Sequence, residues 1–210
     1  MPRPRRIDDA TLLNAAREVF VEKGPGATSR EVAARAGVSE GLLFQRYKTK
    51  ADLFFAAMAP PPVDPSAILP SGDLAIGDRG AFEEAALQIL AYFHEAMPLL
   101  LPLVTHPSFD PERFFDREAP SSLQSWIDAL VVFIDAQRSL DAPATDSRGA
   151  ASLLASAMFG VALIDTIGIH GEPLSEEAVR AMVRALWDGI GRDEIGGEGN
   201  ASDASDAGVR

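Results

Sequence analysis

The sequence of 210 residues contains no cysteine, and no lysine occurs after Lys50. Without cysteine, disulfide bonds, thiolate catalysis and cysteine-ligated zinc are excluded. No apolar run approaches the roughly 18 to 20 residues that a membrane span needs, and the first residues, MPRPRRIDD, lack the apolar region of a signal peptide. These absences predict a soluble, cytoplasmic protein that does not bind or cross a membrane.

The usual patterns of catalytic sites are also missing. The three histidines, His94, His106 and His170, do not have the spacing of metal ligands. The chain contains neither a glycine-rich phosphate loop nor the serine motif of a strand-turn-helix elbow. We therefore expect no enzymatic activity, no catalytic residues, no metal and no cofactor.

Charge is distributed unevenly along the chain. The formal net charge is −12, from 19 basic and 31 acidic residues. Residues 1–50 contain ten of the basic and six of the acidic residues, whereas residues 51–210 contain nine and 25. A basic first segment on an acidic remainder favours contact of that segment alone with nucleic acid, because the acidic part repels phosphate. Chance scatter of charge is the alternative.

Apolar residues recur at helical spacing and no alternating strand pattern is present, so the sequence predicts an all-α fold. Capping residues predict where the helices of the first segment begin. Four helices are expected there, starting after Asp8 or Asp9, at the Thr28–Glu31 capping box, after Ser39 for about nine residues, and after Thr49, with the last ending before Pro60.

The remainder of the chain predicts longer helices. Residues 60–80 are rich in proline and small polar residues and are expected to form a connector. Further helices are predicted at about 81–97, 98–105, 119–140, 146–169 and 175–190. The small, polar and acidic segment from Gly191 onward is expected to be disordered.

The segment from Thr28 to Tyr47 combines two short helices with a tight turn at Gly37, which is helix-turn-helix geometry. In the second of these helices, Leu43 and Tyr47 are four residues apart and are expected to pack inward against Val32 and Val38. The residues left facing outward are Glu40, Gly41, Phe44, Gln45 and Lys48.

Residues 7–55 resemble the DNA-binding head of the tetracycline-repressor (TetR) family of bacterial regulators. The residues that carry the resemblance are Thr28-Ser29-Arg30-Glu31-Val32-Ala33, Ala36-Gly37-Val38-Ser39, Gly41-Leu42-Leu43-Phe44, Tyr47 and Lys48-Thr49-Lys50-Ala51-Asp52-Leu53-Phe54. The remainder of the chain is similar to the family only in length and helical character. The resemblance implies a repressor that binds a pseudo-palindromic double-stranded DNA operator as a homodimer and is released by a small-molecule effector.

The resemblance also assigns roles to residues of the head. It implies that the DNA backbone is held by Thr28, Ser29, Ser39 and Lys50, and that bases are approached by Arg30, Glu40, Gly41, Leu42 and Gln45. Phe44 departs from the family, which usually has a phosphate-binding tyrosine at this position. We expect Arg46, where histidine is common, to supply part of that phosphate contact, and the arm residues Arg3, Arg5 and Arg6 to supply more.

For the body, the resemblance implies an effector site between helices and a four-helix dimer interface. The candidate effector residues are Tyr92, Phe93, His94, Met97, Trp126, Leu130, Phe133, Met158, Phe159 and Asp165. The candidate dimer residues are Leu154, Met158, Val161, Val179, Met182, Val183, Leu186 and Trp187. For both sets, the alternative is that the residues only complete the core of one chain.

The predicted organisation is a DNA-binding domain with a basic arm at 1–55, an effector-binding and dimerisation domain at 56–190, and an acidic tail at 191–210. A helical protein that binds a small molecule and has no DNA function is the main alternative. An effector that is mainly apolar, with one or two hydrogen bonds or a positive charge, fits the candidate residues.

Overall fold

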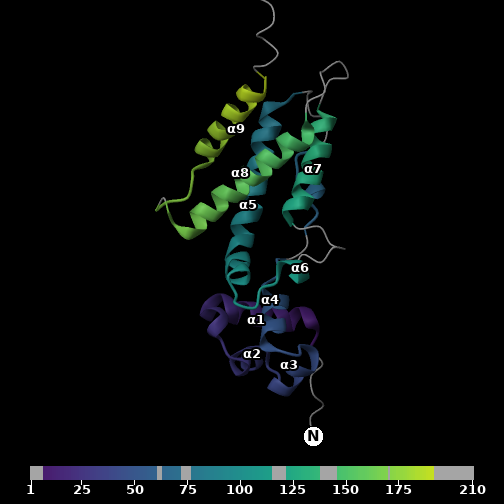
Figure 1. The fold of residues 1–210 in the computed structure, drawn as a ribbon, viewed down its shortest axis with the longest axis vertical. Coiled ribbons are helices and arrows are strands. Elements are labelled where there is room, and N and C mark those ends of the chain that lie inside the picture. Colours follow the sequence, from purple (N-terminus) through teal and green to yellow (C-terminus); the bar gives the residue numbers. More distant parts are fainter. Residues whose placement is uncertain are drawn as a thin grey trace, which may run out of the picture.

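The computed structural model describes residues 7–60, 63–71, 77–114, 122–137, 146–169 and 171–191. Within these ranges every regular element is a helix, which confirms the predicted all-α fold. A head of short helices lies at one end, and a body of longer helices extends away from it (Figure 1). The predicted acidic tail after Gly191 and the basic arm at 1–6 lie outside the described residues.

The head contains the four predicted helices. They are α1 (Asp9–Lys23), α2 (Ser29–Ala36), α3 (Glu40–Arg46) and α4 (Lys50–Met58), with a 3-10 turn, η1 (Gly24–Gly26), between the first two. Each helix begins after a side chain that accepts a hydrogen bond from its first turn, and these caps are Asp8, Thr28, Ser39 and Thr49. The local capping pattern therefore determines where all four helices start.

A compact apolar core joins the four helices of the head. Leu12, Phe20, Val32, Leu43 and Phe54 are all at most 1% exposed and belong to one cluster. The rings of Phe20 and Phe54 meet edge to face with centroids 5.0 Å apart. This core fixes α3 from behind, so that its opposite side is free to contact a ligand.

Arg17 adds a polar link between α1 and α4. Its Nε donates to the Ala57 carbonyl at 2.8 Å, and its Nη2 donates to the Ala59 carbonyl at 3.3 Å. A guanidinium at a helix C-terminus satisfies unpaired carbonyls and complements the helix dipole. The end of α4 is thus held against α1.

The body is built on one long central helix. Its elements are η2 (Pro65–Ala67), α5 (Arg79–Val104), α6 (Pro111–Phe114), α7 (Ser122–Ala136), α8 (Ser147–Ile167) and α9 (Glu176–Gly191). The two helices predicted at 81–97 and 98–105 are one helix, which corrects the expected break at Pro98. Proline removes one donor from a helix but does not always end it, and α5 continues through both Pro98 and Pro102. The short α6 was not predicted.

One apolar cluster forms the core of the body. It includes Ile89, Phe93, Trp126, Leu130 and Met158, which lie on α5, α7 and α8 and are at most 1% exposed. By length and composition alone, α5 and α8 are also apolar enough to cross a membrane. The sequence has no uninterrupted apolar run of this length, and the two helices meet the criterion by the mean hydropathy of a window. Both helices contribute to this shared core, as helices inside a helical domain do.

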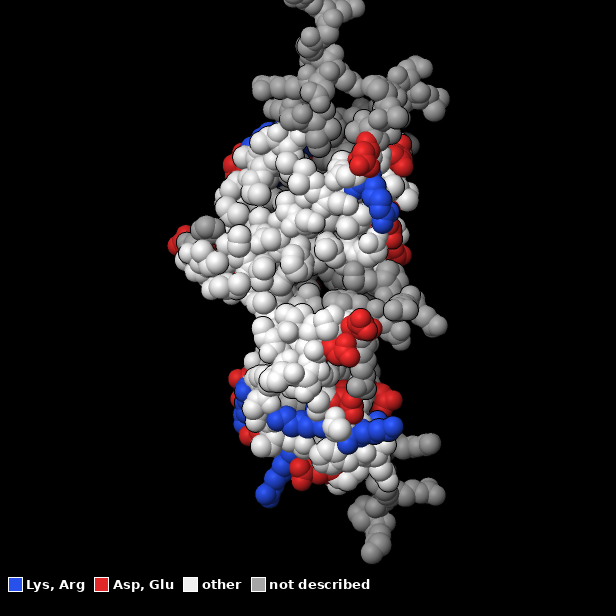
Figure 2. Space-filling model, viewed as in Figure 1, with Lys and Arg blue, Asp and Glu red and all other residues white. Residues whose placement is uncertain are grey.

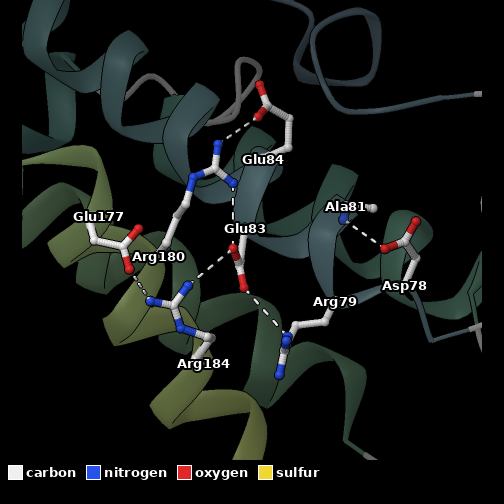
Figure 3. Close-up of polar contacts among 8 residues, drawn as sticks. All are labelled: Asp78, Arg79, Ala81, Glu83, Glu84, Glu177, Arg180 and Arg184. Carbon is white, nitrogen blue, oxygen red and sulfur yellow. Dashed lines mark hydrogen bonds and ion pairs between the residues drawn. The ribbon is translucent and has the colours of Figure 1, made fainter.

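A polar network ties α9 to the start of α5 (Figure 3). Glu83 is only 8% exposed, and its carboxylate lies 3.5 Å from guanidinium nitrogens of Arg79, Arg180 and Arg184. Glu84 contacts Arg180 at 3.4 Å, and Glu177 contacts Arg184 at 2.5 Å. Three carboxylates thus balance three guanidiniums, so a charged cluster holds the outer helix on the central one.

Candidate nucleic-acid interface

The N-terminus of α2 is fixed by a complete capping box. Thr28 Oγ1 accepts from the Glu31 backbone N–H at 3.3 Å, and Glu31 Oε2 accepts from the Thr28 N–H at 2.8 Å. Lys23 Nζ donates to the other carboxylate oxygen of Glu31 at 2.7 Å. The Lys23 contact and the Thr28 bonds lower the pKa of Glu31 to about 2. The start of α2 is therefore held in one geometry near neutral pH.

The turn between α2 and α3 depends on glycine. Gly37 has φ of 68°, a left-handed conformation that disfavours residues with a side chain. The N–H of Val38 donates to the Ala33 carbonyl at 3.0 Å, which closes the end of α2. Ser39 then begins α3, and its Oγ accepts from the Leu42 N–H at 3.3 Å.

The two sides of α3 differ in the way that the sequence predicts. Leu43 is 1% exposed, and Tyr47 packs as a partly buried residue against the same core. Burial raises the pKa of the Tyr47 phenol, and the nearby Asp9 carboxylate adds to the effect. The outward residues Glu40, Gly41, Phe44 and Gln45 of α3 are exposed, as is Lys48, whereas Leu42 is half-buried. Helix α3 has seven residues and not the nine expected, because it ends at Arg46 and the backbone of Tyr47 is extended. An exposed helix side of this kind suits the major groove of DNA.

The predicted backbone-binding residues surround this side of α3. Thr28, Arg30 and Ser39 are exposed, while Ser29 and Lys50 are half-buried. The hydroxyl of Thr28 donates to Glu31 Oε2 at 2.9 Å, so its proton is already engaged. The oxygen of Ser39 accepts a backbone bond, which leaves the hydroxyl proton available to a phosphate.

Arg46, which is predicted to contact a DNA phosphate, makes contacts within the protein. Its Nη1 lies 2.6 Å from Asp9 Oδ1, and its Nη2 donates to the Ile7 carbonyl at 2.6 Å. The guanidinium is thus engaged with the first residue of α1 and with Ile7 before it, and a phosphate contact would compete with these bonds. Sequence reasoning missed Asp9 and Ile7 as partners because they precede Arg46 by 37 and 39 positions and no periodicity connects them.

The candidate effector residues meet in the core of the body. Phe93, Met97, Trp126, Leu130, Phe133 and Met158 are buried, and Tyr92 and Phe159 pack against the same cluster. His94 Nε2 lies 3.0 Å from Asp165 Oδ2. The hydroxyl of Tyr92 and Nε1 of Trp126 are buried without a hydrogen-bond partner among the described residues. Buried donors usually have a partner, so these two groups need an explanation.

The candidate dimer residues divide into two groups. Leu154, Met158, Val161, Val179 and Val183 are at most 6% exposed in the single chain. They lie in the apolar core of this chain and retain little surface, and their place in a dimer interface stays a prediction. Met182, Leu186 and Trp187 are partly buried and retain some surface. Because α8 is apolar around most of its circumference, the sequence pattern does not reveal which side faces inward.

The opposite side of α8 is apolar and exposed. Leu153 is 49% exposed and Ile167 is 56% exposed. Gly160 lies between them on the same side, and a Cβ added there would meet nothing within 4 Å. In Figure 2, the side of the body that carries α8 and α9 shows almost no charged side chains, whereas basic and acidic groups are interspersed on the head.

No group of three or more His, Asp or Glu side chains within the described ranges is arranged to hold a metal ion.

Residues 12–57 match the family model described as "Bacterial regulatory proteins, tetR family". This range contains the whole of α2, α3 and the turn between them, together with most of α1 and α4.

A curated relative agrees with this match in the head, and solved structures resemble the fold. The chain is 44% identical over 59 residues to the HTH-type transcriptional repressor Rv3405c of Mycobacterium tuberculosis, and the match covers 28% of this chain and 31% of that protein. The fold resembles Salmonella enterica GusR with a TM-score of 0.57 at 17% identity, over 86% of this chain and 93% of that one.

It also resembles a TetR variant from Acinetobacter baumannii in complex with minocycline, with a TM-score of 0.53 at 19% identity. That likeness covers 89% of this chain and 98% of the other. The structural likeness extends over head and body, whereas the close sequence relation is confined to the head.

Proposed function

The chain belongs to the tetR family of bacterial regulatory proteins, and we propose that it is a repressor that binds a pseudo-palindromic operator and leaves it when a small effector binds the body. The observation that carries the proposal is the exposed side of α3, whose other side is fixed by Leu43 in the head core. A short helix presented in this way reads base edges with its first residues.

Each contact in the proposed complex follows from side-chain chemistry. Gln45 suits the paired donor and acceptor of adenine, and Glu40 suits the amino group of cytosine. Arg30, at the start of α2, suits guanine, and Leu42 suits the methyl group of thymine. Ser39 donates its free hydroxyl proton to a phosphate, and Lys50 supplies charge to the same strand.

We propose that two copies pair through the exposed side of α8. Leu153, Gly160 and Ile167 are spaced seven residues apart and lie on one stripe of the helix. Glycine in the middle of this stripe allows a second helix to approach closely, and the uncharged surface avoids repulsion between two acidic bodies. Met182 on α9 extends the contact. A dimer gives two α3 helices with the spacing that a palindromic operator requires.

We propose that the effector binds near Tyr92 and Trp126. Their rings lie with centroids 5.5 Å apart, and both leave a buried polar group unpaired. A ligand with a carbonyl or carboxylate oxygen accepts hydrogen bonds from both, which removes the cost of leaving them unsatisfied. The buried carboxylate of Asp165, paired with His94, provides an anchor for a cationic group of the ligand.

Contacts between the end of α5 and the head connect the proposed effector site to the DNA-binding helices. Leu103, near the end of α5, is fully buried in the head core. The ring of His106 stacks on Phe54 at 4.9 Å and meets Phe55 edge to face at 5.1 Å. A shift of α5 on effector binding therefore moves α4 and alters the spacing of the two heads. By linkage, DNA must weaken effector binding by the same factor as effector weakens DNA binding.

A salt series in a mobility-shift assay tests the proposal. A repressor of this kind forms a discrete complex with a specific duplex, and the logarithm of its affinity falls linearly with the logarithm of the salt concentration. A helical protein that binds only a small molecule forms no such complex at any salt concentration. The control is the Gln45→Ala variant, which is expected to lose discrimination at one base pair while its fold is unchanged.

A further inference from the structure

We propose that a cavity between the head and the body binds a neutral aromatic ligand with a carbonyl oxygen, and that this ligand competes with DNA for Lys48. The site is separate from the proposed effector site near Tyr92 and Trp126, which belong to the core of the body. The effect on DNA binding rests on the proposed function, whereas binding of the ligand itself does not depend on it.

The cavity has a volume of about 640 Å³, and small-molecule sites commonly occupy about 300 to 1,000 Å³. We call it the joint pocket. Its lining residues come from the segment that begins α4 and from the segment that follows α5, and they are Lys48, Thr49, Ala51, Asp52, Phe55, Ser108, Phe109 and Asp110. A ligand in the joint pocket therefore contacts the head and the body at once.

Aromatic rings form one wall of the joint pocket. The rings of Phe55 and Phe109 have centroids 6.4 Å apart and are tilted by 44°. The ring of His106 meets Phe55 edge to face at 5.1 Å and stacks on Phe54 at 4.9 Å. Because Phe54 is fully buried in the head core, this group of rings rests on fixed structure. A flat aromatic ligand gains apolar contact and ring packing on such a wall.

The body side of the joint pocket is held by a short hydrogen-bonded turn. The N–H of Ser108 donates to His106 Nδ1 at 3.1 Å, and the N–H of Phe109 donates to the His106 carbonyl at 2.9 Å. The side chain of Phe109 also packs against the head core. These contacts place Ser108 and Phe109 at the cavity before a ligand binds, which lowers the entropic cost of binding.

Two donors of the joint pocket are available to a ligand. Lys48 and Ser108 are exposed, and neither the ammonium nor the hydroxyl has a partner among the described residues. Thr49 and Asp52 are instead bonded to each other, because Asp52 Oδ2 accepts from the Thr49 N–H at 3.1 Å and from its hydroxyl at 2.9 Å. Since both available groups can donate, we expect the ligand to present an acceptor oxygen.

The charges of the lining residues favour a ligand without net charge. The carboxylates of Asp52 and Asp110 disfavour an anion in the joint pocket. Both carboxylates already accept hydrogen bonds at the start of a helix, Asp52 from Thr49 and Asp110 from the Glu112 N–H at 3.0 Å. A cation would compete with these bonds and would leave Lys48 without an acceptor. A neutral carbonyl meets neither difficulty.

Lys48 connects the joint pocket to DNA binding. It lies two residues after the end of α3, on the side that is predicted to face DNA. An ammonium that donates to a ligand carbonyl is drawn away from a phosphate, so ligand and DNA weaken each other's binding by the same factor. Loss of one lysine contact in each chain of a dimer lowers the salt slope of DNA binding by about 2.

Coumarin, a neutral bicyclic aromatic lactone, is the probe for the joint pocket. Coumarin-3-carboxylate adds a negative charge, and naphthalene keeps two fused rings but lacks the carbonyl. Binding to the isotope-labelled full chain is followed by NMR titration without DNA, through the amide signals of Ser108 and Phe109. We expect coumarin to shift both signals and to bind about fivefold more tightly than either analogue, because only coumarin offers an acceptor without net charge.

Two substitutions of Ser108 test the location of the site, with the Phe109 amide as the reporter. Ser108→Ala removes the hydroxyl and should weaken coumarin binding about fivefold, and Ser108→Trp should fill the cavity and abolish binding. Ser71→Trp, which places the same ring at another exposed serine, is the matched control and should leave binding unchanged. All three variants should bind a selected operator as tightly as the wild type, because neither serine belongs to the proposed DNA contacts.

Operator binding is then measured with and without saturating coumarin. Coumarin should weaken binding by the wild type and by Ser71→Trp about tenfold, because two hydrogen bonds to charged phosphates are lost in a dimer. Ser108→Trp and Lys48→Ala should each bind the operator equally well with and without coumarin.

Each part of the inference has an outcome that overturns it. Unshifted Ser108 and Phe109 signals, or coumarin binding that Ser108→Trp leaves unchanged, would overturn the site. An effect of coumarin on operator binding that persists in Lys48→Ala would overturn the competition for this lysine. Failure of the wild-type chain to bind any duplex would overturn the proposed function, whereas the titration without DNA would still decide whether the site exists.

Discussion

Replacing Glu83 by alanine tests whether the charged cluster holds α9 on α5. Glu83 is the buried centre of the cluster, and its carboxylate meets three guanidiniums at 3.5 Å. Removing one partner of a fully buried ion pair costs about 3 to 5 kcal/mol. Here the contacts are long and the arginine side chains are 29% to 52% exposed, so solvent screens them.

Arg180 and Arg184 also keep Glu84 and Glu177 as partners after the change. The expected cost of Glu83→Ala is therefore about 1 to 2 kcal/mol, below the range for a fully buried pair. In a protein of this size that cost lowers the unfolding temperature by about 2 to 8 °C.

Glu84→Ala is the matched control, because Glu84 is the next residue, contacts Arg180 at a similar distance and has a side chain that is 48% exposed. An exposed pair contributes about 0 to 1 kcal/mol. Both variants are to be compared by calorimetry and urea unfolding at one protein concentration and at two salt concentrations. Equal stability of the two variants, or a Glu83→Ala protein as stable as the wild type, would show that the charged cluster does not hold α9 on α5.

Four further outcomes follow from the structure. The pKa of Glu31 is about 2 in the folded chain and about 4.5 when unfolded, so the stability that ionised Glu31 gives the folded chain is complete above pH 4.5 and is lost as the pH falls toward 2. Glu31→Gln should flatten the dependence of the urea midpoint on pH in this range, and an unchanged dependence would contradict this. Leu153→Glu should yield monomers in sedimentation, whereas Val132→Glu, at a 69% exposed site on α7, should not. Phe44→Tyr should restore a phosphate hydrogen bond and tighten operator binding about fivefold, corresponding to about 1 kcal/mol; equal binding would show that the position does not face phosphate. Tyr92→Phe should stabilise the free protein by about 1 kcal/mol by removing an unpaired hydroxyl, and should weaken effector binding, as measured by calorimetry.

The head could be predicted from the sequence in more detail than the body. Its helix starts depend on local signals, such as the Thr28 capping box and the left-handed turn at Gly37, which act over three or four residues. The inward position of Leu43 follows from its spacing within one short amphipathic helix. Such features do not depend on distant parts of the chain, so pattern and structure agree there.

The body depends on contacts between residues that are far apart in the sequence. The pairing of Glu83 with Arg180 spans 97 positions, and no periodicity indicates which of two adjacent glutamates is buried. Because α8 is apolar around most of its circumference, the sequence pattern does not distinguish Leu154, which is buried in the core, from Leu153, which is exposed. Pro98 indicated a helix end that packing around α5 overrides.

Selection of bound sequences from a random duplex library, followed by measurement of the number of chains per duplex, decides whether the protein reads a specific DNA sequence as a dimer. We expect an inverted repeat whose half-site centres are about 10 base pairs, or a multiple of that, apart, with an even number of chains bound. Recovery of no enriched sequence, or of a single half-site occupied by one chain, would contradict it.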